Sequence, residues 1–257
     1  MIKFLAVTDL HYCTKNEPIE RRHCLSAKKL KKIIDEHSNG CDFIIDLGDT
    51  ADGLPGYGDQ KELMGEIADI LKSSNLPYRC VIGNHDTSLP KEQIADILNM
   101  PGRYYSFDTR DYTCLVLDAN MNDPSAPLPD KEILWSETYL DPEQLKWMKD
   151  TIDGSQKPVL VFCHELFILR EYENPNDHVI LNRDEAVKIF EESDKVKAVF
   201  CGHYHFGDYV LKNGIHYVTF GSLCLHEDLT CAVVTIDKNE LKIEGFGRQE
   251  SMQLKLR

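Results

Sequence analysis

The stretch Phe43-Ile-Ile-Asp-Leu-Gly-Asp-Thr-Ala-Asp52 joins an apolar run to a glycine and two closely spaced carboxylates. Its first five residues are mostly apolar, as expected for a strand that is buried on both faces of a sheet. Gly48 allows the chain to turn tightly where this run ends. Asp49 lies at that turn, where its carboxylate can bridge two cations. For Asp49 taken alone, a turn or helix-capping role is the alternative.

Four further segments repeat this geometry, in which side chains that can bind a metal follow a strand-like run. Residues two apart in an extended segment project to one side, so Asp9 and His11 can meet one metal, and His203 and His205 share this parity. Asn84 offers an amide oxygen, which suits Mn, Fe or Mg-type ions. The crevice beyond strand carboxyl ends is the usual site position in α/β sheets. A lone histidine after such a run is more often a core residue, so the inference rests on the set. The candidate ligands are Asp9, His11, Asp49, Asn84, His164, His203 and His205.

Apolar runs alternate with helical spacing through the first two-thirds of the chain. Strands are predicted at 2–7, 43–47, 79–82, 114–117, 159–162 and 198–201, and helices at 22–37, 61–73, 91–98, 142–152 and 183–192. Strands separated by turns follow at 209–211, 215–220, 230–236 and 241–245. This order indicates an α/β fold of two packed sheets flanked by helices, in a single domain over residues 1–257.

The composition excludes several classes of protein. The 257 residues carry 29 basic and 43 acidic side chains, a net charge of −14. This charge repels polyanions, so we expect no nucleic-acid partner, whereas a small anionic substrate at bound cations is compatible. No apolar stretch approaches the roughly 20 residues that span a bilayer, and the N-terminal run is too short for a signal sequence. We therefore expect a cytoplasmic protein with no membrane partner. The nine scattered cysteines predict reduced thiols, most of them buried.

Two features have both a functional and a structural interpretation. Lys28, Lys29, Lys31 and Lys32 are interpreted as a solvated helix face rather than a binding patch. The loop 123–136, rich in proline and acidic residues, is either a lid over the site or inert surface. Candidates for substrate contact are Tyr12, Tyr204, His178, Asn182 and Arg183, with packing as the alternative for the two tyrosines.

The five motifs, in this order, resemble the calcineurin-like metallophosphoesterase superfamily over roughly residues 1–222. The resemblance implies a four-layer α/β/β/α sandwich of two mixed sheets with a dinuclear metal centre. It implies that one metal is held by Asp9, His11, Asp49 and His205, and the other by Asp49, Asn84, His164 and His203. It also implies that His85 donates a proton to the leaving oxygen and that Asp52 fixes the orientation of His85.

Closer similarity is carried by Arg21-Arg-His-Cys-Leu25, Leu47-Gly-Asp-Thr-Ala-Asp-Gly53, Leu117-Asp-Ala119 and Gly202–Gly221. These stretches resemble the manganese-dependent ADP-ribose/CDP-alcohol diphosphatases, whereas the histidine at position 11 is similar to the class III cyclic-nucleotide phosphodiesterase branch.

We therefore expect a metal-dependent phosphohydrolase with two divalent ions (Mn, Fe, Zn or mixed). It would hydrolyse a small phosphodiester or nucleotide-diphosphate bond by attack of a metal-activated hydroxide. The alternatives are a phosphomonoesterase of the same fold and, from a different class, a non-catalytic metal-binding interaction scaffold. The sequence leaves the oligomeric state open.

Overall fold

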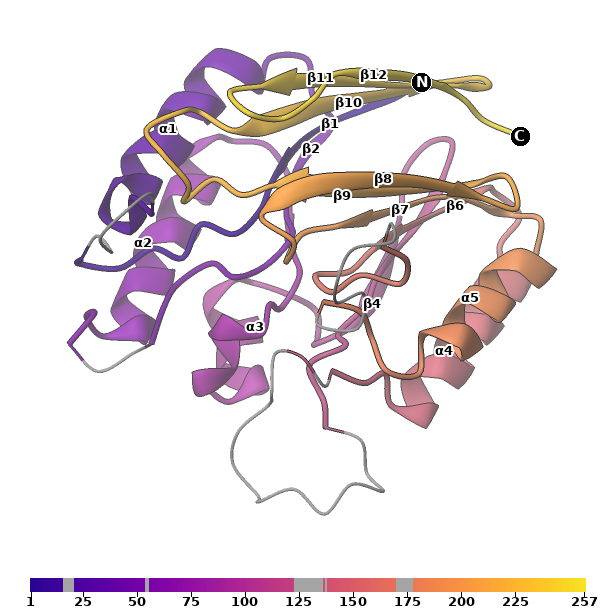
Figure 1. Cartoon of the computed structure of the whole chain (residues 1–257), viewed down its shortest axis with the longest axis horizontal. Helices are drawn as coiled ribbons and strands as arrows, with labels where there is room; N and C mark the ends of the chain where they lie inside the picture. The colour runs from indigo at the N-terminus through magenta and orange to yellow at the C-terminus, as the bar shows by residue number, and fades with distance from the viewer. Residues whose placement is uncertain (16–20, 54–55, 123–135, 137, 170–177) are drawn as a thin grey trace.

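Two six-stranded sheets form the centre of the structure, and helices cover the outer face of each (Figure 1). The computed structural model describes residues 1–15, 21–53, 56–122, 136, 138–169 and 178–257. Helices α1, α2 and α3 lie on one side and α4 and α5 on the other (Figure 1). The helices are α1 (Ser26–His37), α2 (Gln60–Ser73), α3 (Lys91–Ile97), α4 (Pro142–Gly154) and α5 (Arg183–Glu192), with 3-10 turns η1 (His23–Leu25) and η2 (His85–Ser88).

The first sheet has the order β12-β11-β10-β1-β2-β3 and the second the order β4-β5-β6-β7-β9-β8. The strands of the first sheet are β1 (Ile2–Val7), β2 (Phe43–Asp46), β3 (Tyr78–Cys80), β10 (Cys231–Asp237), β11 (Glu240–Phe246) and β12 (Met252–Lys255). Those of the second are β4 (Tyr105–Asp108), β5 (Thr113–Val116), β6 (Val159–Phe162), β7 (Val196–Cys201), β8 (Phe206–Lys212) and β9 (Ile215–Gly221).

Both sheets are mixed. Strand β1 runs parallel to β2 and antiparallel to β10, and β9 runs parallel to β7 and antiparallel to β8. The predicted four-layer α/β/β/α sandwich is therefore confirmed. Strands β4 and β12, which lie at sheet edges, were not predicted from the sequence.

Aromatic rings fill the space between the two sheets. The ring of Phe4 in β1 lies 5.6 Å from that of Phe162 in β6 and 5.5 Å from that of Phe200 in β7. Strand β6 is fully buried because Leu160 and Phe162 face this core, while Val159 and Val161 pack in the second core with α4 and α5. Burial on both faces explains the continuous apolar pattern of this strand. It also fixes where the strand ends and the candidate ligands begin.

Lys29 differs from the solvated helix face that was predicted for the four lysines of α1. Lys28, Lys31 and Lys32 are exposed, as predicted for a solvated face, but Lys29 is buried. Its ammonium group donates to the backbone oxygens of Leu223, Leu225 and His226, with distances of 3.5 Å and 3.2 Å to the last two. Carbonyl oxygens thus replace water around this charge, which makes the burial tolerable. Lys29 ties α1 to the segment that follows β9.

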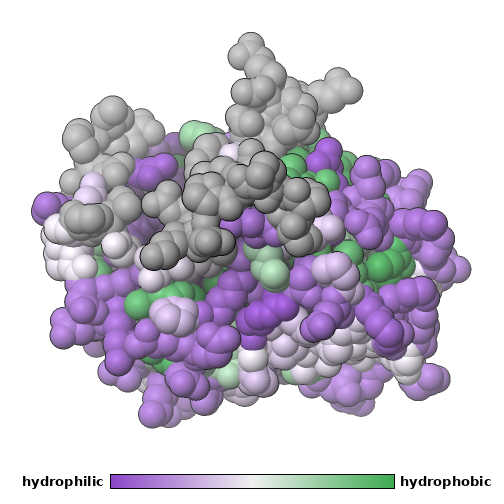
Figure 2. All heavy atoms as spheres, turned by 90° about the horizontal axis from the view of Figure 1, so that it is seen from below, coloured by the Kyte–Doolittle hydropathy of each residue, from purple (hydrophilic) through white to green (hydrophobic). Residues whose placement is uncertain are grey.

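The surface agrees with the acidic composition. Hydrophilic side chains cover most of the face shown in Figure 2. None of the nine cysteines, all of which lie in the described ranges, forms a disulfide, and all except Cys24 are buried. Over the ranges that the structure describes, no helix is both long and apolar enough to cross a membrane. The loop 123–136, for which a lid and inert surface are the two interpretations, falls, apart from Ser136, outside the described residues.

Candidate metal centre

The first three candidate ligands lie in the loops that leave β1 and β2. These strands are parallel, so their carboxyl ends meet at one edge of the first sheet. The two loops are joined by backbone hydrogen bonds, from Asp9 N to Gly48 O at 3.0 Å and from His11 N to Asp49 O at 2.8 Å. Ligand atoms of Asp9, His11 and Asp49 consequently lie within 4.8 Å of one another.

The second sheet contributes histidines to the same place. His164 follows β6, and His203 and His205 lie between β7 and β8. The Nε2 atom of His164 is 3.2 Å from Asp49 Oδ2, and Nε2 of His205 is 3.3 Å from Asp9 Oδ1. Ligand atoms of Asp49, His164 and His203 form a second group within 4.8 Å. Asp49 therefore belongs to two adjacent groups, which is the geometry of a shared ligand.

Several ligand positions adopt a strained backbone. The φ angles of Asp9, His11, Asp49 and His203 are 52°, 44°, 55° and 64°. This left-handed region is uncommon outside glycine, and strain of this kind clusters at functional sites. Space is equally restricted, because a Cβ atom on Gly83 would lie 2.2 Å from Asp49 N. The packed loops therefore hold the ligand side chains in conformations that an isolated segment would avoid.

Buried polar atoms at the centre fit bound cations. Asp9 Oδ2 accepts a hydrogen bond from the Thr8 hydroxyl at 2.7 Å, but within the described residues the fully buried Oδ1 has no hydrogen-bond partner. His164 Nδ1 lies 2.8 Å from Leu47 O and donates to it, so Nε2 is the ring atom left for a cation. Although burial lowers the pKa of His164, the nearby Asp49 holds it well above its ordinary value, and a cation would take the place of the Nε2 proton. That Nε2, which faces Asp49 Oδ2 at 3.2 Å, and the side-chain oxygen of Asn84 are also buried without a well-aligned hydrogen bond in the part of the chain that the structure describes. Buried polar groups are normally satisfied, and divalent cations would satisfy these.

Two facing imidazole rings also indicate that a cation binds here. His11 Nδ1 lies 2.8 Å from Asp52 Oδ1 and donates to it, which leaves Nε2 facing the centre. Although burial lowers the pKa of His11, Asp49 and Asp52 hold it well above its ordinary value, and a cation would take the place of the Nε2 proton. His11 Nε2 lies 3.1 Å from His205 Nε2, so a proton or a cation is needed between them. Burial lowers the pKa of His205, and it lowers that of His203 to about 3 with help from the neighbouring His164. Neutral imidazole is the form that binds metals. The donor set therefore fits two divalent ions.

The carboxylate of Asp52 contacts three histidine rings beside the candidate ligands. Its Oδ1 accepts from Nδ1 of His85 at 2.7 Å and of His11 at 2.8 Å, and its Oδ2 lies 3.2 Å from His23 Nδ1. Burial alone would raise the pKa of Asp52, but the histidines, His11 foremost, hold it below its ordinary value. The side chain of His85 is 32% exposed, whereas Asp52 and His11 are buried. The pair predicted from the sequence is thus adjacent, and His85 faces outward.

The part played by His23 was not predicted from the sequence. This residue is fully buried in η1 and completes the contacts of Asp52. A histidine at the start of a helical segment carries no spacing signal of its own. Only its place in the quoted stretch Arg21–Leu25 could have drawn attention to it.

Asp86 organises the backbone beneath the centre. Its Oδ1 accepts from the amides of Thr50 at 2.9 Å and Ala51 at 3.3 Å, and its Oδ2 from those of Asp49 at 3.1 Å and Gly83 at 2.9 Å. Burial and the nearby Asp49 raise its pKa to about 7. One carboxylate therefore joins the loops after β2 and β3.

The remaining candidates divide into two groups. His178 lies beside the centre, with ring centroids 5.3 Å from His203 and 5.2 Å from Tyr204. Tyr204 also contacts Phe206, which is 76% exposed. The others bond to residues outside the set of candidate ligands: Tyr12 donates to Glu66, Asn182 bonds both backbone groups of Leu140, and Arg183 donates to Ile180 O.

Two of the curated proteins that are similar to this chain in sequence are a phosphatase and a diphosphatase. The serine/threonine-protein phosphatase CPPED1 of Danio rerio is 27% identical over 174 residues, which cover 63% of this chain and 53% of that protein. The chain thus spans about half the length of this curated relative. The manganese-dependent ADP-ribose/CDP-alcohol diphosphatase of Oryza sativa subsp. japonica is 22% identical over 241 residues, 77% of this chain and 74% of that protein.

A similar fold occurs in the crystal structure of a dimetal phosphatase from Danio rerio. Its TM-score is 0.82 at 15% sequence identity, and the alignment covers 100% of this chain and 99% of that one. The sequence pattern of the calcineurin-like phosphoesterases matches residues 2–207, which include all seven candidate ligands together with His85 and Asp52. On this match, the chain belongs to the calcineurin-like phosphoesterase family.

Proposed function

We propose that the chain is a metal-dependent phosphohydrolase that cleaves a small phosphodiester or nucleotide-diphosphate bond. The observation that carries the proposal is the pair of ligand groups that share Asp49, with a partly exposed histidine at their rim. Two divalent cations bound there would neutralise phosphoryl charge and activate water for attack. The proposed ligands are Asp9, His11, Asp49, Asn84, His164, His203 and His205.

His85 is the proposed proton donor to the leaving oxygen. Its Nδ1 lies 2.7 Å from Asp52 Oδ1, which accepts the Nδ1 proton and fixes the ring orientation. Nε2 then remains as the ring atom that can exchange a proton with substrate. The backbone amide of His85 donates to Asp49 Oδ1 at 2.8 Å, so the backbone of His85 is held beside the shared ligand.

The surroundings favour a substrate with a planar part. Phe206 directly follows His205, is 76% exposed and meets Tyr204 at 5.7 Å between ring centroids. Exposed aromatic rings stack on planar groups such as nucleobases. The diphosphatase from Oryza sativa named above acts, by its name, on such a substrate. The charge of −14 favours a small substrate rather than nucleic acid.

A phosphomonoesterase is the second candidate, and the name of the CPPED1 relative favours it. An interaction scaffold is the third. It requires no turnover, although a scaffold has no evident need for the contact between His85 and Asp52.

A three-substrate assay tests these candidates. The Mn²⁺-loaded chain is incubated with bis-p-nitrophenyl phosphate, p-nitrophenyl phosphate and ADP-ribose. Asp49→Ala should abolish turnover and most metal binding, and His85→Ala should lose turnover while two metals stay bound. His37→Ala, at the far end of α1, is the matched control and should behave like the parent.

Each outcome selects one candidate. Turnover of the diester or of ADP-ribose, lost in both site variants, supports the proposal. Turnover of the monoester alone would replace it with a phosphatase. Full metal binding without turnover of any of the three substrates would favour the scaffold.

A further inference from the structure

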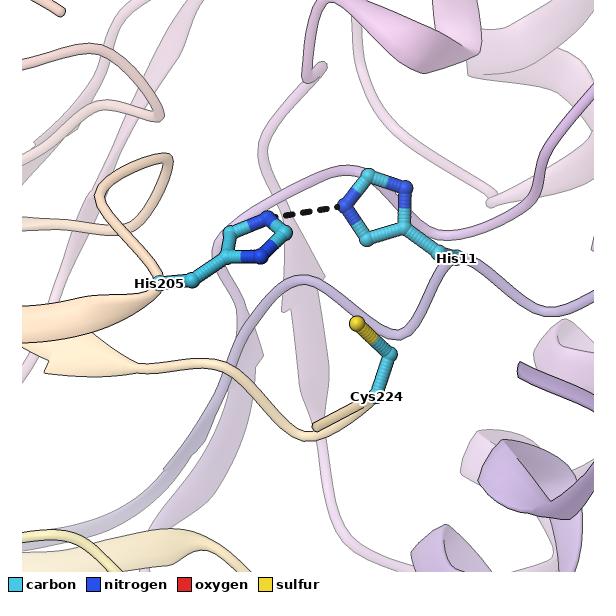
Figure 3. Close-up of side chains that lie close together, drawn as sticks. All are labelled: His11, His205 and Cys224. Carbon is cyan, nitrogen blue, oxygen red and sulfur yellow. Dashed lines mark hydrogen bonds between the residues drawn. The ribbon is translucent and has the colours of Figure 1, made fainter. Parts of the chain in front are cut away.

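A buried thiol lies beside two of the proposed metal ligands. The Cys224 side chain points toward the facing rings of His11 and His205 (Figure 3). Its sulfur and one nitrogen of each histidine lie within 4.8 Å of one another. Cys224 is fully buried, and so is Asp9 Oδ1, which lies 3.3 Å from His205 Nε2 and has no hydrogen-bond partner in the described parts of the chain. Two imidazole nitrogens and one thiol therefore meet at one position, and a carboxylate oxygen lies beside one of the imidazoles.

The backbone holds this thiol in place. Cys224 N donates to Asp9 O at 3.0 Å, and Leu223 N donates to Thr8 O at 3.0 Å. The buried Lys29 binds the carbonyl oxygens on both sides of Cys224. Cys224 is therefore fixed against the loop that carries Asp9 and His11, which is the preorganisation that a ligand needs.

We propose that Cys224 contributes a thiolate to the metal position of His11 and His205, so that this position selects a thiophilic cation such as Zn²⁺ or Cd²⁺ over Mn²⁺. Soft thiolate ligands favour such ions over those that prefer oxygen donors. On coordination the thiol releases its proton to solvent, and the Ser222 hydroxyl, 3.1 Å away, can donate to the sulfur. The proposal rests on the metal centre of the proposed function and adds a ligand to it.

Two other cysteines provide a comparison. Cys163 and Cys201 also adjoin ligand loops, but both belong to the apolar core under α4 and α5. Neither belongs to a metal-binding group within the described ranges. A position near a ligand in the sequence therefore does not by itself bring a thiol to the centre. Cys224 lies there because the backbone of Leu223 and Cys224 is hydrogen-bonded to Thr8 and Asp9.

Absorption spectroscopy of the Co²⁺- and Cd²⁺-loaded chain tests the proposal without any substrate. Thiolate bound to these ions gives ligand-to-metal charge-transfer bands in the ultraviolet. Metal content is measured in parallel, and affinities for Cd²⁺ and Mn²⁺ are obtained by competition with a chelator. The variants are Cys224→Ser, with Cys201→Ser as the buried control and Cys24→Ser as the exposed control.

The parent and both controls should show the band with two metals bound, and Cys224→Ser should lose it. The preference for Cd²⁺ over Mn²⁺ should fall about 10- to 100-fold in Cys224→Ser. Two bound metals without a band in the parent would overturn the thiolate while leaving the centre standing. A failure of the parent to bind metal would overturn both. The parent measurement decides even if Cys224→Ser does not fold, and a band that persists in a folded Cys224→Ser would also refute the proposal.

Discussion

Asp86→Asn should destabilise the chain and weaken metal binding together. The carboxylate accepts four backbone N–H groups, two on each oxygen. Asparagine keeps one acceptor oxygen and presents an NH₂ group to the other two amides. Two buried N–H groups then lose their partners, at about 1–3 kcal/mol each. Burial and Asp49 raise the pKa of Asp86 to about 7, so the native carboxylate is itself partly disfavoured. Two such groups together cost about 2–6 kcal/mol, and we expect a loss of about 3 kcal/mol, in the lower half of that range.

Urea unfolding at pH 8, where Asp86 is largely ionised, measures this loss in chelator and in saturating Mn²⁺. Calorimetric titration gives the metal affinity. Because two of the affected amides belong to Asp49 and Gly83, the affinity should fall as well. The matched control is Asp96→Asn, at an exposed position of α3, which should change stability by less than about 0.5 kcal/mol. If Asp86→Asn matched that control in both measurements, the reasoning about the loop would be refuted.

Three further perturbations follow from the same contacts. Gly83→Ala should lower the melting temperature and the metal affinity, because its Cβ would meet Asp49 N. The control Gly65→Ala, which has open space around it in α2, should instead be stabilising by about 0.5–1 kcal/mol. Equal stability of the two variants would contradict this prediction. Burial and the nearby Asp86 raise the pKa of Asp46 to about 8, so the folded state keeps a proton that the unfolded state loses above about pH 4. The stability that Asp46 contributes should fall as pH rises from about 4 to 8, so Asp46→Asn should make the pH slope of the unfolding free energy less negative by up to about 1.4 kcal/mol per pH unit; parallel unfolding profiles of the parent and the variant would exclude this. Chelation should lower the melting temperature, since cations bind the folded centre; an unchanged value in a metal-replete sample would count against the site.

Much of the fold could be predicted because buried strands leave a strong pattern. Strand β6 is apolar at every position since both of its faces are covered, and the end of the run locates His164. Parallel pairing of β1 and β2 then brings Asp9 and Asp49 together without any long-range information beyond strand order.

Edge strands and single buried charges could not be predicted from this apolar pattern. Strand β12 alternates partly exposed and exposed residues at a sheet edge, so its sequence lacks the apolar signal. Lys29 lies within a run of exposed lysines, and its burial depends on carbonyl oxygens nearly 200 positions along the chain. His23 reaches Asp52 for a similar reason. Such contacts are set by tertiary packing, which periodicity within one segment does not encode.

The candidate metal centre has two features that cost free energy, and bound cations would account for both. Four of its seven proposed ligands occupy left-handed backbone conformations, and buried acceptor atoms, Asp9 Oδ1 among them, lack hydrogen-bond donors within the described residues. A fold stabilised only by its apolar cores gains nothing from either feature, because each costs free energy. Cations would compensate the acceptor atoms directly, and the backbone conformation is what points those atoms inward. The strain at Asp9 and Asp49 is therefore best understood as part of the binding site, stabilised by the contacts of Asp86 and by the narrow approach at Gly83.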